Sequence, residues 1–208
     1  MDVSKTTAAP SATADADKEH HLITLVTNRR VKAFASRELA RIATEVILFQ
    51  ERRCALRLDG FIVMPDHIHI ICEPLADLDL VVRNIRELIS SMTLSHLAVA
   101  DRNMLRSIES PGQREEGPVF RLWRRGYHHV RIPTKEKLFE SLRYMYEHPV
   151  RSGICAAAIE YEFSDMHRHL GSILRTGEDR PCLVPARKGR GRPLPSRGRG
   201  LGRRHPSV

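Results

Sequence analysis

Residues 61–72 read FIVMPDHIHIIC, and this stretch decides the fold. Its apolar, β-branched composition predicts β-structure. Pro65 interrupts the run, because proline lacks a backbone N–H and fixes φ. We therefore expect two neighbouring strands arranged as a hairpin, over about residues 54–63 and 67–72, with the first strand bent or interrupted near Gly60.

Two histidines, His67 and His69, flank one aliphatic residue in the second of these strands. Side chains alternate between the faces of a strand, so the two imidazoles share one face while Ile68 and Ile70 point into a core. Imidazoles held about 6–7 Å apart on a rigid strand can converge on one divalent cation. The alternative is a half-buried strand whose histidines are merely polar.

The pattern around the hairpin predicts alternating strands and helices. A helix over about residues 78–100 should bury a stripe made of Val81, Ile85, Leu88, Met92 and Leu97. Residues 101–117 are polar and should be irregular. In chain order we expect a strand over 21–27, a helix capped by Ser36, the hairpin, the helix over 78–100, a strand within 119–132 and a helix capped by Thr134. This β-α-β-β-α-β order is that of an α+β, ferredoxin-like split βαβ fold with an antiparallel sheet and the histidines on a central strand.

The length of 208 residues predicts one domain with tails. Residues 1–20 should be disordered, 21–172 should form the domain, and 173–208 should be a disordered Gly/Arg/Pro-rich tail. No run of 18 apolar residues exists, so no membrane span is expected. The four scattered cysteines form no C-x-x-C pair, which is typical of reduced thiols and a cytoplasmic, bacterial-type protein.

The net charge of +9 is concentrated at the C-terminus. Residues 187–208 carry eight Lys/Arg and no acidic residue, so the rest of the chain is nearly neutral. Such a tail favours polyanions, nucleic acid first. Arg190 and Arg192 stand in an Arg-Gly-Arg-Pro run that resembles an AT-hook core, although general electrostatic affinity explains the same residues.

The helix expected after Thr134 separates its two tyrosines. A helical wheel places Leu138, Leu142 and Met145 on the buried face, with Phe139 and Tyr146 beside them. Spaced by four residues, Tyr144 and His148 share the exposed face. A solvent-facing phenol beside a metal could act as a nucleophile, and the histidine could be a third ligand. An ordinary surface tyrosine and a helix C-terminal cation are the alternatives.

Together these motifs resemble those of the single-tyrosine HUH transposases, especially the REP-associated tyrosine transposases. Residues 63–69, VMPDHIH, are similar to the family signature apolar-Met-Pro-(Asn/Asp/Glu)-His-apolar-His. Residues 144–153, YMYEHPVRSG, resemble Tyr-Ile-x-x-Asn-Pro-Val-(Arg/Lys)-x-Gly, whose first tyrosine is the nucleophile. A third segment, residues 163–171, resembles one common after the catalytic helix. This chain departs from the family at His148, where relatives carry Asn or Gln.

The resemblance implies a DNA strand transesterase that acts on single-stranded or hairpin DNA. It implies Tyr144 as the nucleophile and a divalent metal, Mg²⁺ or Mn²⁺, held by His67, His69 and His148. Relatives act as monomers or homodimers. A catalytically silent DNA-binding descendant and an RNA-binding protein are the other functions considered. The arginines that would follow a DNA strand, with a solvated face as the alternative, are Arg121, Arg124, Arg125 and Arg131.

Overall fold

The computed structural model describes residues 19–110 and 119–167 of the chain. Four strands form an antiparallel sheet in the order β2-β3-β1-β6. These strands are β1 (His20–Val26), β2 (Leu56–Met64), β3 (His67–Pro74) and β6 (His128–Ile132). With α1 (Arg37–Arg52) between β1 and β2, and α2 (Leu78–Ala100) between β3 and β6, this is the split βαβ topology that the sequence predicts.

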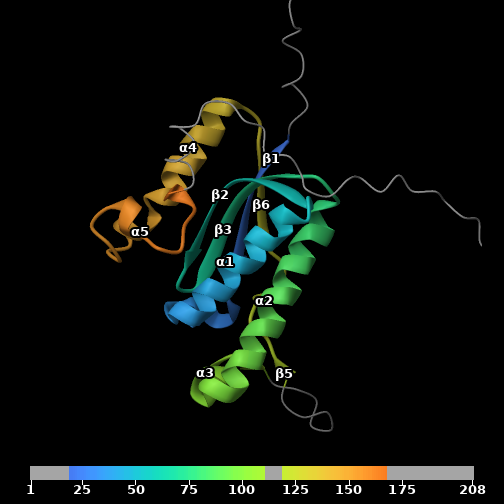
Figure 1. Ribbon diagram of the computed structural model, residues 1–208, viewed down its shortest axis with the longest axis vertical. Coiled ribbons are helices and arrows are strands. Elements are labelled where there is room, and N and C mark those ends of the chain that lie inside the picture. The colour runs from blue at the N-terminus through green and yellow to red at the C-terminus, as the bar shows by residue number, and fades with distance from the viewer. Residues whose placement is uncertain (1–18, 111–118, 168–208) are drawn as a thin grey trace, which may run out of the picture.

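The helices α1 and α2 lie together on one face of the sheet (Figure 1). The main core fills the space between them and includes the buried Ile68 and Ile70 of β3. Both helices have the caps expected of their first residues: Ser36 accepts from the N–H of Leu39, and Asp77 from that of Leu80. None of the described helices is long and apolar enough to cross a lipid bilayer.

The predicted inward stripe of α2 is confirmed at Val81, Ile85 and Leu97 but is wrong at two positions. Leu88 and Met92 are 37% and 45% exposed, whereas Val82 and Ile89 are buried. A helix buries the stripe that faces its neighbours, and α2 packs against α1 and shares the main core with the sheet. Which of two adjoining apolar stripes turns inward is therefore set by that packing.

The segment after α2, predicted to be irregular, is partly regular in the structure. A short helix, α3 (Arg102–Ser107), begins there because Asp101 accepts hydrogen bonds from the N–H groups of the helix's second and third residues. Two short strands, β4 (Glu109–Ser110) and β5 (Val119–Phe120), then pair antiparallel. Ile108, between the helix and β4, is fully buried in the main core and ties this insertion to the domain.

On the other face of the sheet lies α4 (Lys135–Tyr146), which packs on β2 and β6 and covers part of this face. As expected, Thr134 caps it by accepting from the N–H of Lys137. A second, smaller core forms here from Ile62, Ile71, Ile132 and Met145. Phe139 does not join it: this side chain is 69% exposed, which corrects its predicted place beside the buried face.

A close approach of α4 to β2 depends on Gly60. An added Cβ at this glycine would lie 2.6 Å from Leu142 Cδ2, 2.7 Å from Tyr146 Oη and 2.9 Å from Met145 Cε. The expected irregularity of β2 is present as a register shift between Leu58 and Gly60. Absence of a side chain at this position therefore sets how near the helix comes to the sheet.

The free edge of β2 is occupied by the chain that follows α5 (His148–Arg151). The N–H of Val63 donates to the carbonyl of Phe163, and the N–H of Phe61 donates to the buried Asp165 carboxylate at 2.7 Å. Tyr146 donates to the same carboxylate at 2.9 Å. Part of the third segment that resembles the family, residues 163–171, thus has a structural role. It pairs with the edge strand β2 and holds α4 through the hydrogen bond from Tyr146 to Asp165. Its last four residues lie outside the described chain.

Two cysteines, Cys72 and Cys155, carry free thiols, as expected from the sequence. Cys54 differs from that expectation because it is disulfide-bonded. Burial raises the pKa of the Cys72 thiol to about 12, so this sulfur is an inert part of the core.

Candidate metal centre and nucleophile

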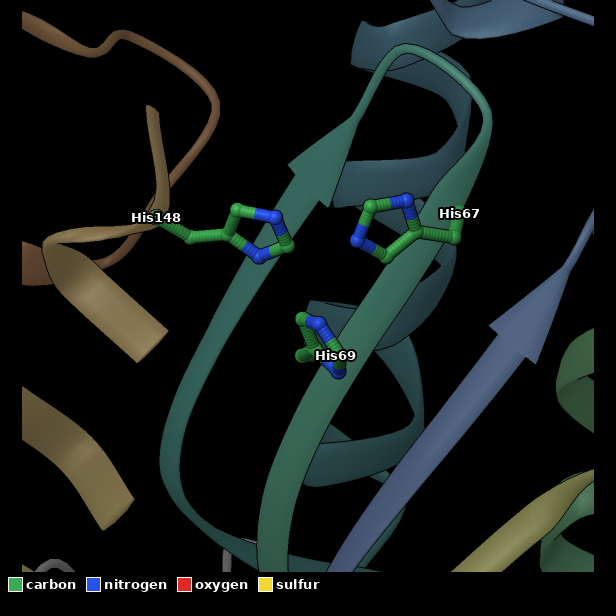
Figure 2. A group of neighbouring side chains, drawn as sticks. All are labelled: His67, His69 and His148. Carbon is green, nitrogen blue, oxygen red and sulfur yellow. The ribbon is translucent and has the colours of Figure 1, made fainter. Parts of the chain in front are cut away.

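Three histidines from distant parts of the sequence converge on one point. His67 and His69 project from β3, and His148 reaches them from the start of α5 (Figure 2). The ring centroids are 4.8 Å apart for His67–His69, 4.9 Å for His67–His148 and 5.4 Å for His69–His148. One nitrogen from each ring lies within 4.8 Å of the others, a spacing compatible with a shared metal ion.

His67 and His69 are each oriented by a hydrogen-bond partner at Nδ1. The Nδ1 atom of His67 lies 2.6 Å from an Asp66 carboxylate oxygen, and Nδ1 of His69 lies 2.9 Å from Thr24 Oγ1. Arg30 in turn donates to Asp66 at 3.1 Å. Such partners fix the ring and leave the other nitrogen, Nε2, free for a ligand.

The residues present fit a metal ion. Nδ1 of His148 is buried and has no hydrogen-bond partner among the described residues. A buried polar atom without a partner is costly, and a cation would satisfy it. Three neutral imidazoles form a ligand set that suits transition metals such as Zn²⁺ and leaves further coordination positions open for a substrate oxygen.

The environment keeps the imidazoles of His69 and His148 neutral. Burial lowers the pKa of His69 to about 3, and neighbouring His67 and His148 act in the same direction. The pKa of His148 is also lowered, first by burial and then by His67 and Arg151. For Asp66, burial acts to raise the pKa, but His67 and Arg30 together hold it below its ordinary value. Neutral rings beside an ionised carboxylate are the protonation states that bind a cation.

The last turn of α4 carries Tyr144, whose side chain is 59% exposed. The wheel prediction for the two tyrosines is confirmed, because half-buried Tyr146 points into the smaller core and donates to Asp165. The helix itself ends earlier than the wheel assumed. Pro149 has no N–H to donate, so α4 ends at Tyr146 and α5 starts at His148.

The position of Tyr144 is fixed by Arg151. The guanidinium carbon lies 4.0 Å from the centre of the phenol ring, and Nη2 donates to the Tyr144 carbonyl at 2.7 Å. Its other amino group contacts the Glu147 carboxylate at 3.3 Å. Arg151 thus replaces the intrahelical donor that the helix break removes, and it stacks on the candidate nucleophile.

Sequence reasoning did not assign Asp66, Thr24 and Arg151 to the site. Asp66 was within reach of a sequence argument, because it directly precedes His67 in the motif. Thr24 had no such signal: it faces His69 only through the register of β1 with β3, which the hydrophobic pattern does not specify to a single residue.

The predicted DNA-binding arginines do not form one cluster. Arg124 and Arg125 line a cavity with Thr24, on the face of the sheet that carries His67 and His69. Arg121 is exposed on the chain that enters this turn. By contrast, Arg131 pairs with His21 on the opposite face and bonds to Glu19 at 2.6 Å. Arg190 and Arg192 lie outside the described residues.

Comparisons with known proteins bear on the fold. No protein-family model matches the chain, and no curated protein matches it. Among solved structures, a REP-associated tyrosine transposase bound to a REP hairpin superposes with a TM-score of 0.52 at 16% identity, covering 86% of this chain and 96% of its own.

A candidate transposase from Deinococcus radiodurans R1 matches with a TM-score of 0.38 at 16% identity, over 65% of this chain and 95% of its own. The similarity to the hairpin-bound transposase, together with the strand order, supports the architecture. The chain therefore has the α+β fold of a REP-associated tyrosine transposase, consistent with the single-tyrosine HUH transposase family that its motifs resemble.

Proposed function

We propose that this protein cleaves and rejoins single-stranded DNA through a covalent tyrosine intermediate, acting on strands that carry a hairpin. The observation that carries the proposal is the convergence of three imidazoles one helical turn from an exposed tyrosine. The solved neighbour with a TM-score of 0.52, a transposase bound to a hairpin, supports DNA as the substrate class.

In this proposal His67, His69 and His148 hold one divalent metal ion. When bound, the ion would polarise a phosphate oxygen and stabilise the charge that develops on it. Asp66 and Thr24 keep the two strand imidazoles oriented with Nε2 toward the ion. The protein supplies position and electrostatic stabilisation, which account for most of the acceleration in phosphoryl transfer.

The nucleophile is the phenol oxygen of Tyr144. It attacks phosphorus, an oxygen–phosphorus bond forms to the tyrosine, and the bond to the 3′ oxygen breaks. The phenol gives up its proton, and the leaving strand ends as a free 3′-OH. The 5′ end stays attached to the protein as a phosphotyrosine, so a second 3′-OH can reverse the step without an external energy source. Arg151 holds the phenol in place for this attack.

A covalent-adduct assay tests the proposal. The full-length protein is incubated with hairpin oligonucleotides that carry randomised unpaired flanks, with Mn²⁺ or Mg²⁺, and adducts are separated on a denaturing gel. We expect an adduct with the wild-type protein and none with Tyr144→Phe, because the variant lacks the attacking oxygen.

Tyr146→Phe is the matched control: it removes one hydrogen bond to Asp165 but not the attacking oxygen, so the adduct should still form, although in a smaller amount. An adduct that persists in Tyr144→Phe would show that another residue is the nucleophile. A wild-type protein that binds the hairpin but forms no adduct would instead support the catalytically silent DNA-binding alternative.

A further inference from the structure

Part of the sheet face that carries the histidines is left uncovered by α4. Thr24 and Val26 of β1 lie opposite His69 and His67, and His128 of β6 lies opposite Thr24, so these side chains share that face. Further along β6, Val130 on the same face is 58% exposed. The uncovered surface therefore begins at the three-histidine cluster and extends toward the edge strand β6.

A cavity of about 140 Å³ opens on this surface. It is formed by two β1 residues, the start of β6 and the turn before it, namely Thr24, Val26, Arg124, Arg125, Gly126, Tyr127 and His128. We call it the Arg124 pocket. Because Thr24 also contacts His69 Nδ1 at 2.9 Å, the pocket and the candidate metal centre share a residue.

Hydrogen bonds to backbone atoms fix the walls of the Arg124 pocket. The N–H of Arg124 donates to the Val26 carbonyl at 2.9 Å, and the Arg124 carbonyl accepts from Arg86 at 2.8 Å. Gly126 has φ of +69°, a left-handed conformation that glycine adopts without strain. The turn is therefore built before any ligand arrives, while the ends of the two arginines remain exposed.

Positive charge in the Arg124 pocket is not neutralised by any residue that the structure describes. None of its lining residues is acidic, and among the described residues neither Arg124 nor Arg125 takes part in an ion pair or side-chain hydrogen bond. Arg131 and Arg30, in contrast, are each paired with a carboxylate. Two unpaired guanidinium groups on a preformed turn favour an anion with several acceptor oxygens, above all a phosphate.

The size of the pocket limits that anion to a single phosphate group. Its volume is about that of four to five water molecules in liquid water, at about 30 Å³ each. A phosphate with part of its sugar fits such a space. The position next to the histidines also matches a strand whose neighbouring phosphate lies at the metal centre.

A larger cavity of about 490 Å³, next to α2, does not share these properties. Its lining includes Arg83 and Arg86, but also Asp79 and Glu87, so the charges balance. Tyr127, which lines both cavities, turns its hydroxyl to Asp79. This second cavity therefore lacks the unpaired positive charge that distinguishes the Arg124 pocket.

We propose that the Arg124 pocket binds the backbone phosphate next to the one held at the three-histidine cluster, and so selects an unpaired strand beside the hairpin. This inference rests on the proposed function for the identity of the DNA substrate. It adds a binding site for a second phosphate, formed by the two guanidinium groups and His128.

A phosphate-neutralisation scan tests the proposal. Full-length Tyr144→Phe protein, which cannot attack the DNA, is titrated with Mn²⁺ and hairpin oligonucleotides in which one flank phosphate at a time is a neutral methylphosphonate. The same titrations are made with Arg124→Ala/Arg125→Ala added. We expect one flank position to weaken binding about tenfold or more in the first protein and to have no effect in the second.

Salt dependence gives a second readout. On single strands each phosphate contact contributes about 0.7 to the slope of log affinity against log salt. Loss of one contact should therefore reduce the slope by about 0.7 in Arg124→Ala/Arg125→Ala. Arg102→Ala/Arg106→Ala removes two exposed arginines of α3, away from the histidine face, and should change neither the slope nor the scan.

The proposal is overturned if every neutralised phosphate costs the same affinity in both proteins. It is also overturned if the salt slope falls but the arginine substitutions abolish the effect of no single methylphosphonate. That result would indicate general electrostatic attraction and not a defined phosphate pocket. Failure of the proposed chemistry gives a different result. If one methylphosphonate loses its effect in the arginine variant but the wild-type protein forms no covalent adduct, the phosphate site is supported and the transesterase activity is excluded.

Discussion

His148 is the residue at which this chain departs from the family it resembles, and the structure gives it a defined place. Its ring lies 4.9 Å from His67 and 5.4 Å from His69, and its buried Nδ1 has no partner among the described residues. An amide at this position would offer an oxygen, which suits Mg²⁺, whereas imidazole favours transition metals. This single residue is therefore expected to shift the metal preference of the site.

We predict that the wild-type protein binds Mn²⁺ or Zn²⁺ more tightly than Mg²⁺, and that His148→Asn weakens transition-metal binding. A lost outer-shell partner typically costs about 10–100-fold in metal affinity, and a lost ligand should cost at least as much. Isothermal titration and metal-dependent thermal shifts measure the effect without relying on catalysis. His167→Asn, an exposed histidine, should behave as wild type. His148→Ala offers no ligand atom at all, so equal affinity of this variant and the wild type for Zn²⁺ would exclude His148 as a ligand.

At the scale of elements, the site depends on how closely α4 packs on β2. His148 directly follows this helix, so any displacement of α4 moves the third imidazole away from His67 and His69. The contact is set from both sides: Gly60 leaves room for the helix, and Asp165 receives hydrogen bonds from Phe61 of β2 and Tyr146 of α4. The packing of α4 on β2 therefore holds the candidate metal centre together.

We predict that Gly60→Ala destabilises the fold by about 1–3 kcal/mol, because its Cβ would overlap three side chains of α4. Denaturant unfolding measures the loss, and weaker metal binding should accompany it. Leu142→Ala removes the nearest of the three contacts, at 2.6 Å. The cost of Gly60→Ala should then be smaller in the Leu142→Ala background than in the wild type. Equal costs in both backgrounds would mean that crowding against α4 is not the cause.

At the scale of the whole molecule, stability depends on pH through its buried histidines. The pKa values of His69, His148 and His21 are all lowered, in each case first by burial. For His69 the folded value is about 3 against an ordinary value of 6.5. Because the unfolded chain takes up these protons first, folding stability is full above about pH 6.5 and falls as the pH drops toward the folded pKa.

We predict a loss of unfolding free energy whose slope approaches about 1.4 kcal/mol per pH unit for His69, in chelator, as the pH falls from about 6.5 to 5. His148 and His21 act in the same direction. Carboxylates titrate mainly below this window. Urea unfolding at a series of pH values measures the slope. His69→Gln should reduce this slope by about 1.4 kcal/mol per pH unit, the contribution of one proton. An unchanged slope in this variant would contradict the lowered pKa of His69.

The sequence by itself determined the secondary structure around the site and its chemical character. The apolar run on both sides of Pro65 specified the hairpin, period-2 alternation put His67 and His69 on one face, and the helical wheel separated exposed Tyr144 from Tyr146. These features are local, since each depends only on residues a few positions apart. The strand and helix order, through the split βαβ rule, was sufficient for the fold class.

Only the tertiary structure decided which distant residues meet. The pairing register of β1 with β3 brought Thr24 behind His69, and the turn before β6 placed Arg124 beside the same threonine while Arg131 went to the opposite face. A shift of one residue reverses the face of every side chain in a strand, and the hydrophobic pattern does not fix register so finely. The physical reason is that convergence depends on packing between elements, which no local periodicity encodes.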